Sequence, residues 1–241
     1  MKTPLWQYNE FKHVGTDFDD PKHVEAYDER HAQFRNVEAE CNGILDLLGL
    51  GSESVVIELG TGTGAFAIHA ARRGAKVYAA DVSRSMLDYA RQKAVKAGLD
   101  NIEFCHGGFL TYEHKAAPAD ALVTCMALHH LPDFWKSIAL RRMNGMLRPG
   151  GQLFINDVVF EEKDALANIV RWLDQLEGVG GRQLRGEVAM HVSKEYSTFD
   201  WIMDGLLTRA GFSIRSKEIS SGVLAKYLCV KSSEAEQPQM A

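Results

Sequence analysis

A carboxylate and a glycine-rich turn lie next to each other in this sequence. Glu58 follows the apolar run 55–57, and Gly60-Thr61-Gly62-Thr63-Gly64 begins two positions later. Glycines let backbone N–H groups approach a ligand at places where a Cβ would collide. Glu58 faces this turn and can accept hydrogen bonds from a cationic group, which a phosphate-binding loop would not require. The pattern predicts a loop that binds a nucleoside carrying an ammonium group.

A second carboxylate, Asp81, ends the next short apolar run, Lys76-Val77-Tyr78-Ala79-Ala80. It lies 17 residues after Gly64, which is about the length of one helix and one return strand. A carboxylate at the tip of that strand can accept hydrogen bonds from both hydroxyls of a ribose. The alternative is that Asp81 caps the next helix, but Ser83 and Ser85 are also available for capping. We therefore favour the ribose role.

The spacing of the glycines distinguishes two kinds of binding turn. Dinucleotide-binding folds space them G-x-G-x-x-G and place a pyrophosphate at the N-terminus of the next helix. Here the spacing is G-x-G-x-G. A tight strand-to-helix turn needs glycine whatever it binds, so the turn alone fits a purely structural role equally well.

Alternating strand and helix patterns must position these residues. Strands are predicted near 54–59, 76–80, 102–106, 119–125, 151–158, 212–219 and 222–230. Helices are predicted near 23–48, 64–73, 84–97, 132–147, 162–178 and 198–210. The last two strands are joined by Ser220-Ser221-Gly222, which is short enough for a hairpin. This alternation predicts an α/β fold with a parallel sheet covered by helices on both faces.

In this order and at this spacing, the motifs resemble those of class I S-adenosylmethionine-dependent methyltransferases over about residues 40–160. The ordered set is far more specific than the glycine turn alone, because it closes with Leu147-Arg148-Pro149-Gly150-Gly151 before a strand. The matching segments are 55–64, 77–87, 101–104, 120–123, 128–133 and 147–151.

The resemblance implies a single domain over residues 1–241. Its expected fold is a Rossmann-like, seven-stranded, mostly parallel sheet with helices on both faces and a C-terminal antiparallel hairpin. It also implies S-adenosyl-L-methionine as cofactor, with in-line transfer of the methyl group to a small-molecule acceptor. The cofactor-binding residues implied by the resemblance are Glu58, Gly60, Thr61, Gly62, Gly64, Asp81, Val82, Met86, Gly108, Phe109, Cys125 and Tyr27.

One position departs from the family pattern. Relatives usually carry an acidic residue after the third strand, which accepts a hydrogen bond from the adenine amino group. Here Cys105-His106-Gly107-Gly108-Phe109 has glycine at that place. We expect backbone groups of Gly108 and Phe109 to hold the adenine instead, with the Phe109 ring stacked on it.

A general base is needed only when the acceptor keeps its proton at neutral pH, as a hydroxyl does. The best candidate is His129, which follows the fourth predicted strand at the edge where open α/β sheets bind ligands. Imidazole also titrates in the useful range. We assign His130 to packing beneath the turn Leu131-Pro132-Asp133. No metal site is expected.

Two regions lie outside the predicted core sheet. Residues 1–35 are rich in aromatic residues and histidines, and we interpret them as an N-terminal cover near the cofactor; packing on the sheet edge is the alternative. Residues 159–200 contain a helical apolar stripe and then Gly178-Val179-Gly180-Gly181, which favours an inserted helical lid that contributes to acceptor specificity. Residues 232–241 are polar and predict a flexible tail.

Composition restricts the partners and the compartment. The formal net charge of −5 argues against nucleic acid as the main partner. No apolar run approaches the length of a membrane span, so no membrane partner is expected. The four cysteines have no C-x-x-C pairing, which indicates reduced thiols and a cytoplasmic protein. The oligomeric state stays open, with a homodimer as one option.

Two other functions stay open at this point. One is an NAD-dependent oxidoreductase, against which the glycine spacing and Glu58 both argue. The other is a protein that binds S-adenosylmethionine without turnover, because the sequence specifies the cofactor half of the site better than the acceptor half. Binding of NAD would support the first, and formation of any methylated product would exclude the second.

Overall fold

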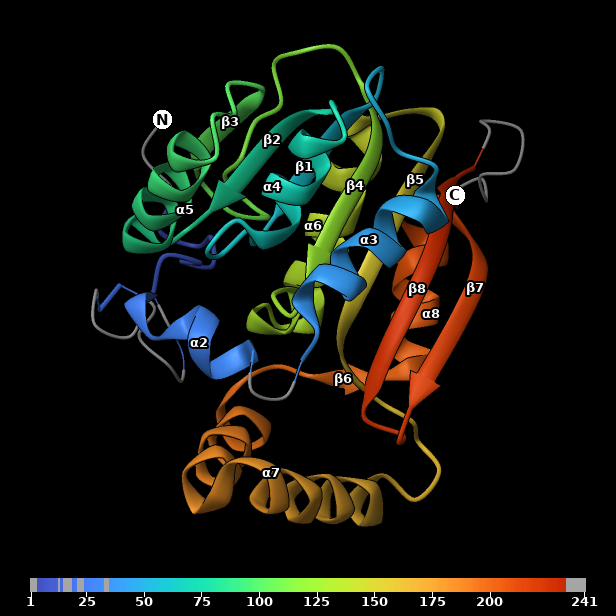
Figure 1. The fold of residues 1–241 in the computed structure, drawn as a ribbon. Helices are drawn as coiled ribbons and strands as arrows, with labels where there is room; N and C mark the ends of the chain where they lie inside the picture. Colours follow the sequence, from blue (N-terminus) through green and yellow to red (C-terminus); the bar gives the residue numbers. More distant parts are fainter. Residues whose placement is uncertain (1–3, 13, 15–18, 21–23, 33–34, 233–241) are drawn as a thin grey trace.

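Seven strands form one sheet in the order β3-β2-β1-β4-β5-β8-β7 (Figure 1). The computed structural model describes residues 4–12, 14, 19–20, 24–32 and 35–232. The strands of this sheet are β1 (Val55–Leu59), β2 (Lys76–Asp81), β3 (Ile102–His106), β4 (Ala119–Cys125), β5 (Leu147–Phe160), β7 (Phe212–Ser220) and β8 (Leu224–Lys231). A two-residue strand, β6 (Thr198–Phe199), pairs with the end of β5 off this path. When β6 is counted with the seven strands of the main path, the described part of the chain has a sheet of eight strands, where seven were expected.

Burial of both faces explains the parallel centre of the sheet. β1 is buried at four of its five positions and β4 at five of seven, because helices cover both faces. One face packs against α3 (Val37–Leu48) and α4 (Ala65–Arg72). The opposite face packs against α6 (Asp133–Met146) and α8 (Asp200–Arg209), which lie behind the sheet in Figure 1. The predicted helix coverage of both faces is confirmed.

The helix that follows β2 begins at a serine cap. In α5 (Arg84–Lys96), the Ser83 hydroxyl oxygen accepts a hydrogen bond from the N–H of Met86 at 3.1 Å. Such a bond satisfies one of the free N–H groups at a helix start. Ser83, and not Asp81, is therefore the N-cap, which leaves the Asp81 carboxylate to the turn and the cavity described below.

Two helix predictions are wrong in their boundaries. The expected helix over 23–48 is divided into α2 (Tyr27–Ala32) and α3, because Asn36 starts a new helix by accepting a hydrogen bond from the N–H of Ala39 at 3.0 Å. The expected helix over 162–178 lies within α7 (Ala165–Lys194), which consists of two helices that meet at Gly181. The backbone leaves helical angles there, with φ 69° and ψ −169°, so the first helix ends at the predicted glycine-rich break and a second helix follows.

The C-terminal hairpin is confirmed. β7 and β8 pair antiparallel, with Ser220 opposite Leu224. The turn between them uses Ser221 and Gly222, both with positive φ. β8 also pairs antiparallel with β5, so the hairpin closes the sheet on this side.

Two helices outside the sheet, α2 and α7, lie at the end of the sheet where the parallel strands finish. Figure 1 shows α2 and α7 beyond the carboxyl ends of the parallel strands, below the sheet in that view. In the described part of the chain, no helix combines the length and apolar character required to cross a membrane. The predicted flexible tail falls almost entirely on 233–241, which lie outside the described residues.

Candidate functional site

A cavity of about 730 Å³ lies at the carboxyl ends of β1, β2 and β4. Small-molecule sites typically occupy about 300–1,000 Å³, and open α/β sheets bind ligands at this edge. Of the thirteen residues predicted for the site, all but Gly64 and His129 line this cavity. The residues that do so are Tyr27, Glu58, Gly60, Thr61, Gly62, Asp81, Val82, Met86, Gly108, Phe109 and Cys125.

Backbone hydrogen bonds tie the glycine turn to the neighbouring strand. The N–H groups of Gly60 and Thr61 both donate to the carbonyl oxygen of Ala80, at 2.9 and 3.0 Å. The N–H of Gly62 donates to the Asp81 carboxylate at 2.7 Å. Each carboxylate oxygen has a second lone pair, so Asp81 can hold the turn and still accept from a ligand hydroxyl in the cavity.

Gly64 supports this turn from outside the cavity. Its φ of +76° is left-handed, and a Cβ there would lie 2.9 Å from the Cβ of Ala90 in α5. Real Cβ atoms do not approach so closely, so glycine at this position lets α4 pack against α5. The structure therefore gives Gly64 a role in helix packing, and its predicted contact with the cofactor stays a prediction.

The carboxyl group of Glu58 is buried at the end of β1, with only 3% of the residue exposed. It accepts a hydrogen bond from the Thr61 hydroxyl at 2.5 Å. Burial nevertheless raises the pKa of Glu58 to about 8, because the charged form loses its hydration. Near neutral pH this group is therefore largely a neutral acid, and a ligand ammonium beside it would favour its ionised form.

This leads to a first prediction, for binding of S-adenosylhomocysteine (SAH). At pH 7, SAH should displace up to about one proton from Glu58, so affinity should rise by up to about tenfold per pH unit as the pH approaches 8. Calorimetric titration in two buffers of different ionisation enthalpy measures the released proton. The Glu58→Gln variant should release none. Equal proton release from this variant would contradict the assignment.

The same raised pKa predicts a stability change in the ligand-free protein. The unfolded chain releases the Glu58 proton near the ordinary glutamate pKa, whereas the folded chain holds it up to about pH 8. The stabilising contribution of this protonated group is therefore full below the ordinary value and is lost as the pH rises toward 8. Urea unfolding at several pH values should show this decline in the parent protein and a flatter profile in Glu58→Gln.

The helix α2 is fastened to the glycine turn. The Asp28 carboxylate accepts hydrogen bonds from the Thr63 hydroxyl at 2.6 Å and from the Lys93 ammonium at 2.5 Å. This places the neighbouring Tyr27 on the cavity wall. Part of the N-terminal segment thus lies beside the predicted cofactor end, and its role as a cover stays a prediction.

Glu10 occupies the space beside Gly108, where the family's acidic residue is missing. A Cβ at Gly108 would lie 2.5 Å from a carboxylate oxygen of Glu10. That carboxylate accepts hydrogen bonds from the Leu110 N–H at 3.0 Å and from the Thr111 hydroxyl at 2.6 Å, and Glu10 lines the cavity. An acid is therefore present beside the expected adenine site, but it comes from the N-terminal segment.

The two histidines differ in their access to the cavity. His129 is buried, with its side chain 5% exposed, and does not line the cavity. Its Nδ1 contacts the Asp157 carboxylate, and its Nε2 lies 3.2 Å from Oε2 of Glu195. His130 lines the cavity and its side chain is 34% exposed. The imidazole that reaches the cavity is therefore that of His130.

The electrostatic environment also argues against His129 as a general base. Burial opposes a charge on this ring, but the carboxylates of Asp157 and Glu195 outweigh it and raise the pKa of His129 to about 9. The protonated form of the ring is thus favoured when no other cation is present, which opposes its use as a proton acceptor. Burial, together with the neighbouring His129 charge, lowers the pKa of His130, which makes this ring a weak base.

Several cavity residues carry no local signal in the sequence. Glu10 precedes its partner Thr111 by about a hundred positions, and only the fold brings them together. Arg35 lines the cavity and pairs with Glu40 at 2.5 Å. Asn156 reaches the cavity from β5, outside every motif considered above.

Comparison with known proteins identifies related sequences and folds. Residues 56–151 match the family model of a methyltransferase domain. An uncharacterised methyltransferase of Geobacillus kaustophilus is 30% identical over 192 residues, which cover 79% of this chain and 82% of that protein. A SAM-dependent methyltransferase structure from Aquifex aeolicus superposes with a TM-score of 0.60 at 22% identity, covering 88% of this chain and 98% of the other. The structure of the [4+2]-cyclase SpnF superposes with a TM-score of 0.64 at 16% identity, covering 80% of each chain.

The last of these similarities shows that the fold alone does not determine the reaction. The sequence relationship is more specific, because it extends over most of both chains and the relative is a methyltransferase. The same relationship favours methyl transfer over the NAD-dependent oxidoreductase considered above. The chain belongs to a methyltransferase family, and its fold is that of S-adenosylmethionine-dependent methyltransferases.

Proposed function

We propose that this methyltransferase acts on a small, largely apolar acceptor that enters the far end of the same cavity. The carrying observation is that one cavity is lined both by the glycine turn and by Tyr8, Met126, His130, Leu131 and Asn156. We assign the second group of residues to the acceptor end. A cofactor at the turn and an acceptor at that end would meet near the carboxyl end of β4.

The residues at the turn fit S-adenosylmethionine. Asp81 and Gly62 would hold its ribose, and Glu58 would face its ammonium group. When bound, the cofactor supplies a sulfonium methyl group that is already activated for transfer. The chain's own contribution is to hold the acceptor atom in line with that methyl carbon, within about 3–3.5 Å, and to exclude water.

The acceptor end favours an aromatic or apolar molecule. The Tyr8 ring lies 6.5 Å from the Trp135 ring and 6.2 Å from the Tyr196 ring, centroid to centroid. Burial, with the neighbouring Tyr196, raises the pKa of Tyr8 to about 12, so this phenol stays neutral. Of these three rings, Tyr8 lines the cavity. A neutral aromatic surface favours flat apolar molecules over a charged polymer.

Cofactor turnover with candidate acceptors tests this proposal. Purified protein is incubated with methyl-deuterated S-adenosylmethionine and a panel of phenols, thiols, amines and catechols, and SAH formation is followed by mass spectrometry. We expect a product that carries the deuterated methyl group from at least one apolar acceptor. Cofactor binding without any product from the panel or from a small-molecule extract would favour the alternative of binding without turnover.

A third prediction concerns the adenine end. We infer that Glu10 accepts a hydrogen bond from the adenine amino group, in place of the family's missing acid. Replacing Glu10 with glutamine should weaken SAH binding about tenfold, which corresponds to roughly 1.4 kcal/mol for a lost charge-assisted bond. Calorimetry with SAH and with its 6-oxo analogue measures the effect.

The analogue makes this test specific. Its ring oxygen opposes the Glu10 carboxylate, so the parent protein should prefer SAH, and Glu10→Gln should reduce that preference because an amide can donate. The exposed Glu113→Gln is the matched control and should change neither affinity. An unchanged preference in Glu10→Gln would refute the assignment.

A further inference from the structure

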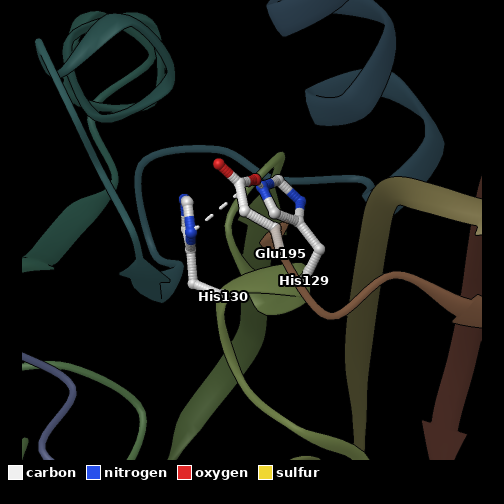
Figure 2. A group of neighbouring side chains, drawn as sticks. All are labelled: His129, His130 and Glu195. Carbon is white, nitrogen blue, oxygen red and sulfur yellow. Dashed lines mark ion pairs between the residues drawn. The ribbon is translucent and has the colours of Figure 1, made fainter. Parts of the chain in front are cut away.

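Three imidazoles and two carboxylates meet beside the acceptor end of the cavity. His129 and His130 belong to the short turn after β4, and Asp157 belongs to β5. His191 lies in the last turn of α7, and Glu195 directly follows that helix. Figure 2 shows the His129 and His130 rings on either side of the Glu195 carboxylate. The cluster therefore joins the inserted helical segment to the core sheet.

The spacing of three of these side chains suits a metal ion. One ligand atom each from His129, His130 and Glu195 lie within 4.8 Å of one another. Oε2 of Glu195 is 3.2 Å from Nε2 of His129 and 3.9 Å from Nδ1 of His130. Bonds of about 2.0–2.1 Å to a common ion place adjacent ligand atoms about 3 Å apart, so small side-chain adjustments complete the site.

The surroundings of these ligands resemble the outer shell of a metal centre. The Nδ1 of His129 contacts the Asp157 carboxylate, which turns Nε2 toward Glu195. The same carboxylate accepts the N–H of Leu128 at 2.7 Å and is almost fully buried. Metal-binding imidazoles commonly donate their second nitrogen to a carboxylate in this way, which fixes the ring and its tautomer.

The Glu195 carboxylate is held by further contacts. His191 contacts Oε2 of Glu195 through Nδ1, and its Nε2 lies 3.0 Å from the Ser197 hydroxyl. The next residue, Tyr196, donates its N–H to the carbonyl oxygen of His129 at 2.8 Å. Glu195 is thus fixed in a buried position, facing the two rings, by contacts on both sides.

We propose that His129, His130 and Glu195 bind a first-row divalent transition-metal ion, for which Zn²⁺ is the probe. Two imidazole nitrogens and one carboxylate favour such ions over Mg²⁺ or Ca²⁺, which prefer oxygen ligands. Because His130 lines the cavity, an ion held by these three residues would lie beside the acceptor end and would keep coordination positions for an acceptor atom. This inference revises the expectation that the chain has no metal site.

The consequence for catalysis rests on the proposed function. An acceptor hydroxyl or thiol bound to the ion would lose its proton to solvent at a lower pH, since a bound cation stabilises the anion. The resulting anion would form a bond to the methyl carbon while the carbon–sulfur bond breaks, and the sulfonium becomes a neutral thioether. This would supply the activation that an acceptor needs when it keeps its proton at neutral pH.

Metal binding is tested directly on the whole chain. After chelator treatment and desalting, Zn²⁺ is titrated calorimetrically, and Co²⁺ is added separately to follow its visible absorption. We expect one ion per chain with a dissociation constant in the micromolar range or tighter. Binding should weaken by more than about 100-fold in His130→Gln and Glu195→Gln, and by about 10–100-fold in Asp157→Asn, which removes only an outer-shell partner.

Controls separate the metal site from folding and from the proposed function. His114→Ala, which removes a histidine bonded to Tyr112 and Ala117 away from the cluster, should bind Zn²⁺ as the parent does. Each variant is checked for circular dichroism and SAH affinity, and His130→Gln changes only a half-exposed ring. The metal site would be overturned if the parent protein did not bind Zn²⁺, or if His130→Gln bound Zn²⁺ as tightly as the parent. Zn²⁺ binding without product from any acceptor would instead leave the metal site and overturn the proposed function.

Discussion

Replacement of Asp81 by asparagine is expected to weaken SAH binding by at least about 100-fold. The carboxylate accepts the Gly62 N–H at 2.7 Å and the Ser83 N–H at 2.9 Å, and it lines the cavity at the predicted ribose position. Hydrogen bonds to a charged group contribute about 1.5–3 kcal/mol each, so losing the charge toward two ribose hydroxyls accounts for this factor. Calorimetric titration with SAH measures it.

The asparagine substitution also reports on the turn itself. An asparagine can keep one acceptor for Gly62 or Ser83, whereas alanine keeps none, so Asp81→Ala should additionally lower the melting temperature. Asp88→Asn on α5 is the matched control, because its carboxylate is exposed and pairs only locally with Arg91. Undiminished SAH affinity in Asp81→Asn would show that this carboxylate holds the turn and does not contact the ligand.

Much of the cofactor end could be predicted because its determinants are local. The acidic residues end short apolar strands, and β1 and β2 are neighbours, with Leu59 opposite Ala80. Two carboxylates at equivalent strand ends must then lie at the same edge of the sheet. The same reasoning places Cys125 at that edge, since β4 pairs with the other side of β1.

The acceptor end could not be predicted in the same way, because its determinants are distant in sequence. His129, and not His130, is the imidazole buried away from the cavity, because its two nitrogens contact Asp157 in β5 and Glu195 after α7. The motif that contains His129 and His130 does not include either carboxylate. The second helix of α7 is a further example, because the glycines predict where the first helix ends but not that another helix follows directly after Gly181.

The second large effect is a loss of stability, which is expected when Gly60 is replaced by alanine. The φ of Gly60 is +77°, and a Cβ there would lie 2.4 Å from the Cβ of Ala127, against about 3.5–4.0 Å for carbon atoms in favourable contact. Left-handed backbone costs a residue with a Cβ about 1–2 kcal/mol, and overpacking adds about 1–3 kcal/mol. Gly60→Ala should therefore lose roughly 2–5 kcal/mol of unfolding free energy and lower the melting temperature by about 5–15 °C.

A second glycine, Gly98, allows the backbone cost of a left-handed residue to be measured separately from the cost of overpacking. Gly98 has a φ of +70°, but no atom lies within 4 Å of the position of its Cβ, so Gly98→Ala should show the backbone cost alone. The overlap with Ala127 should be relieved in the double variant Gly60→Ala/Ala127→Gly, which should then unfold at nearly the free energy of Gly98→Ala. If Gly60→Ala and Gly98→Ala lost equal free energies of unfolding, the turn after β1 would have room to move away from Ala127. Since the N–H of Gly60 belongs to the turn that faces the cavity, we expect SAH affinity to fall in Gly60→Ala and to recover in the double variant.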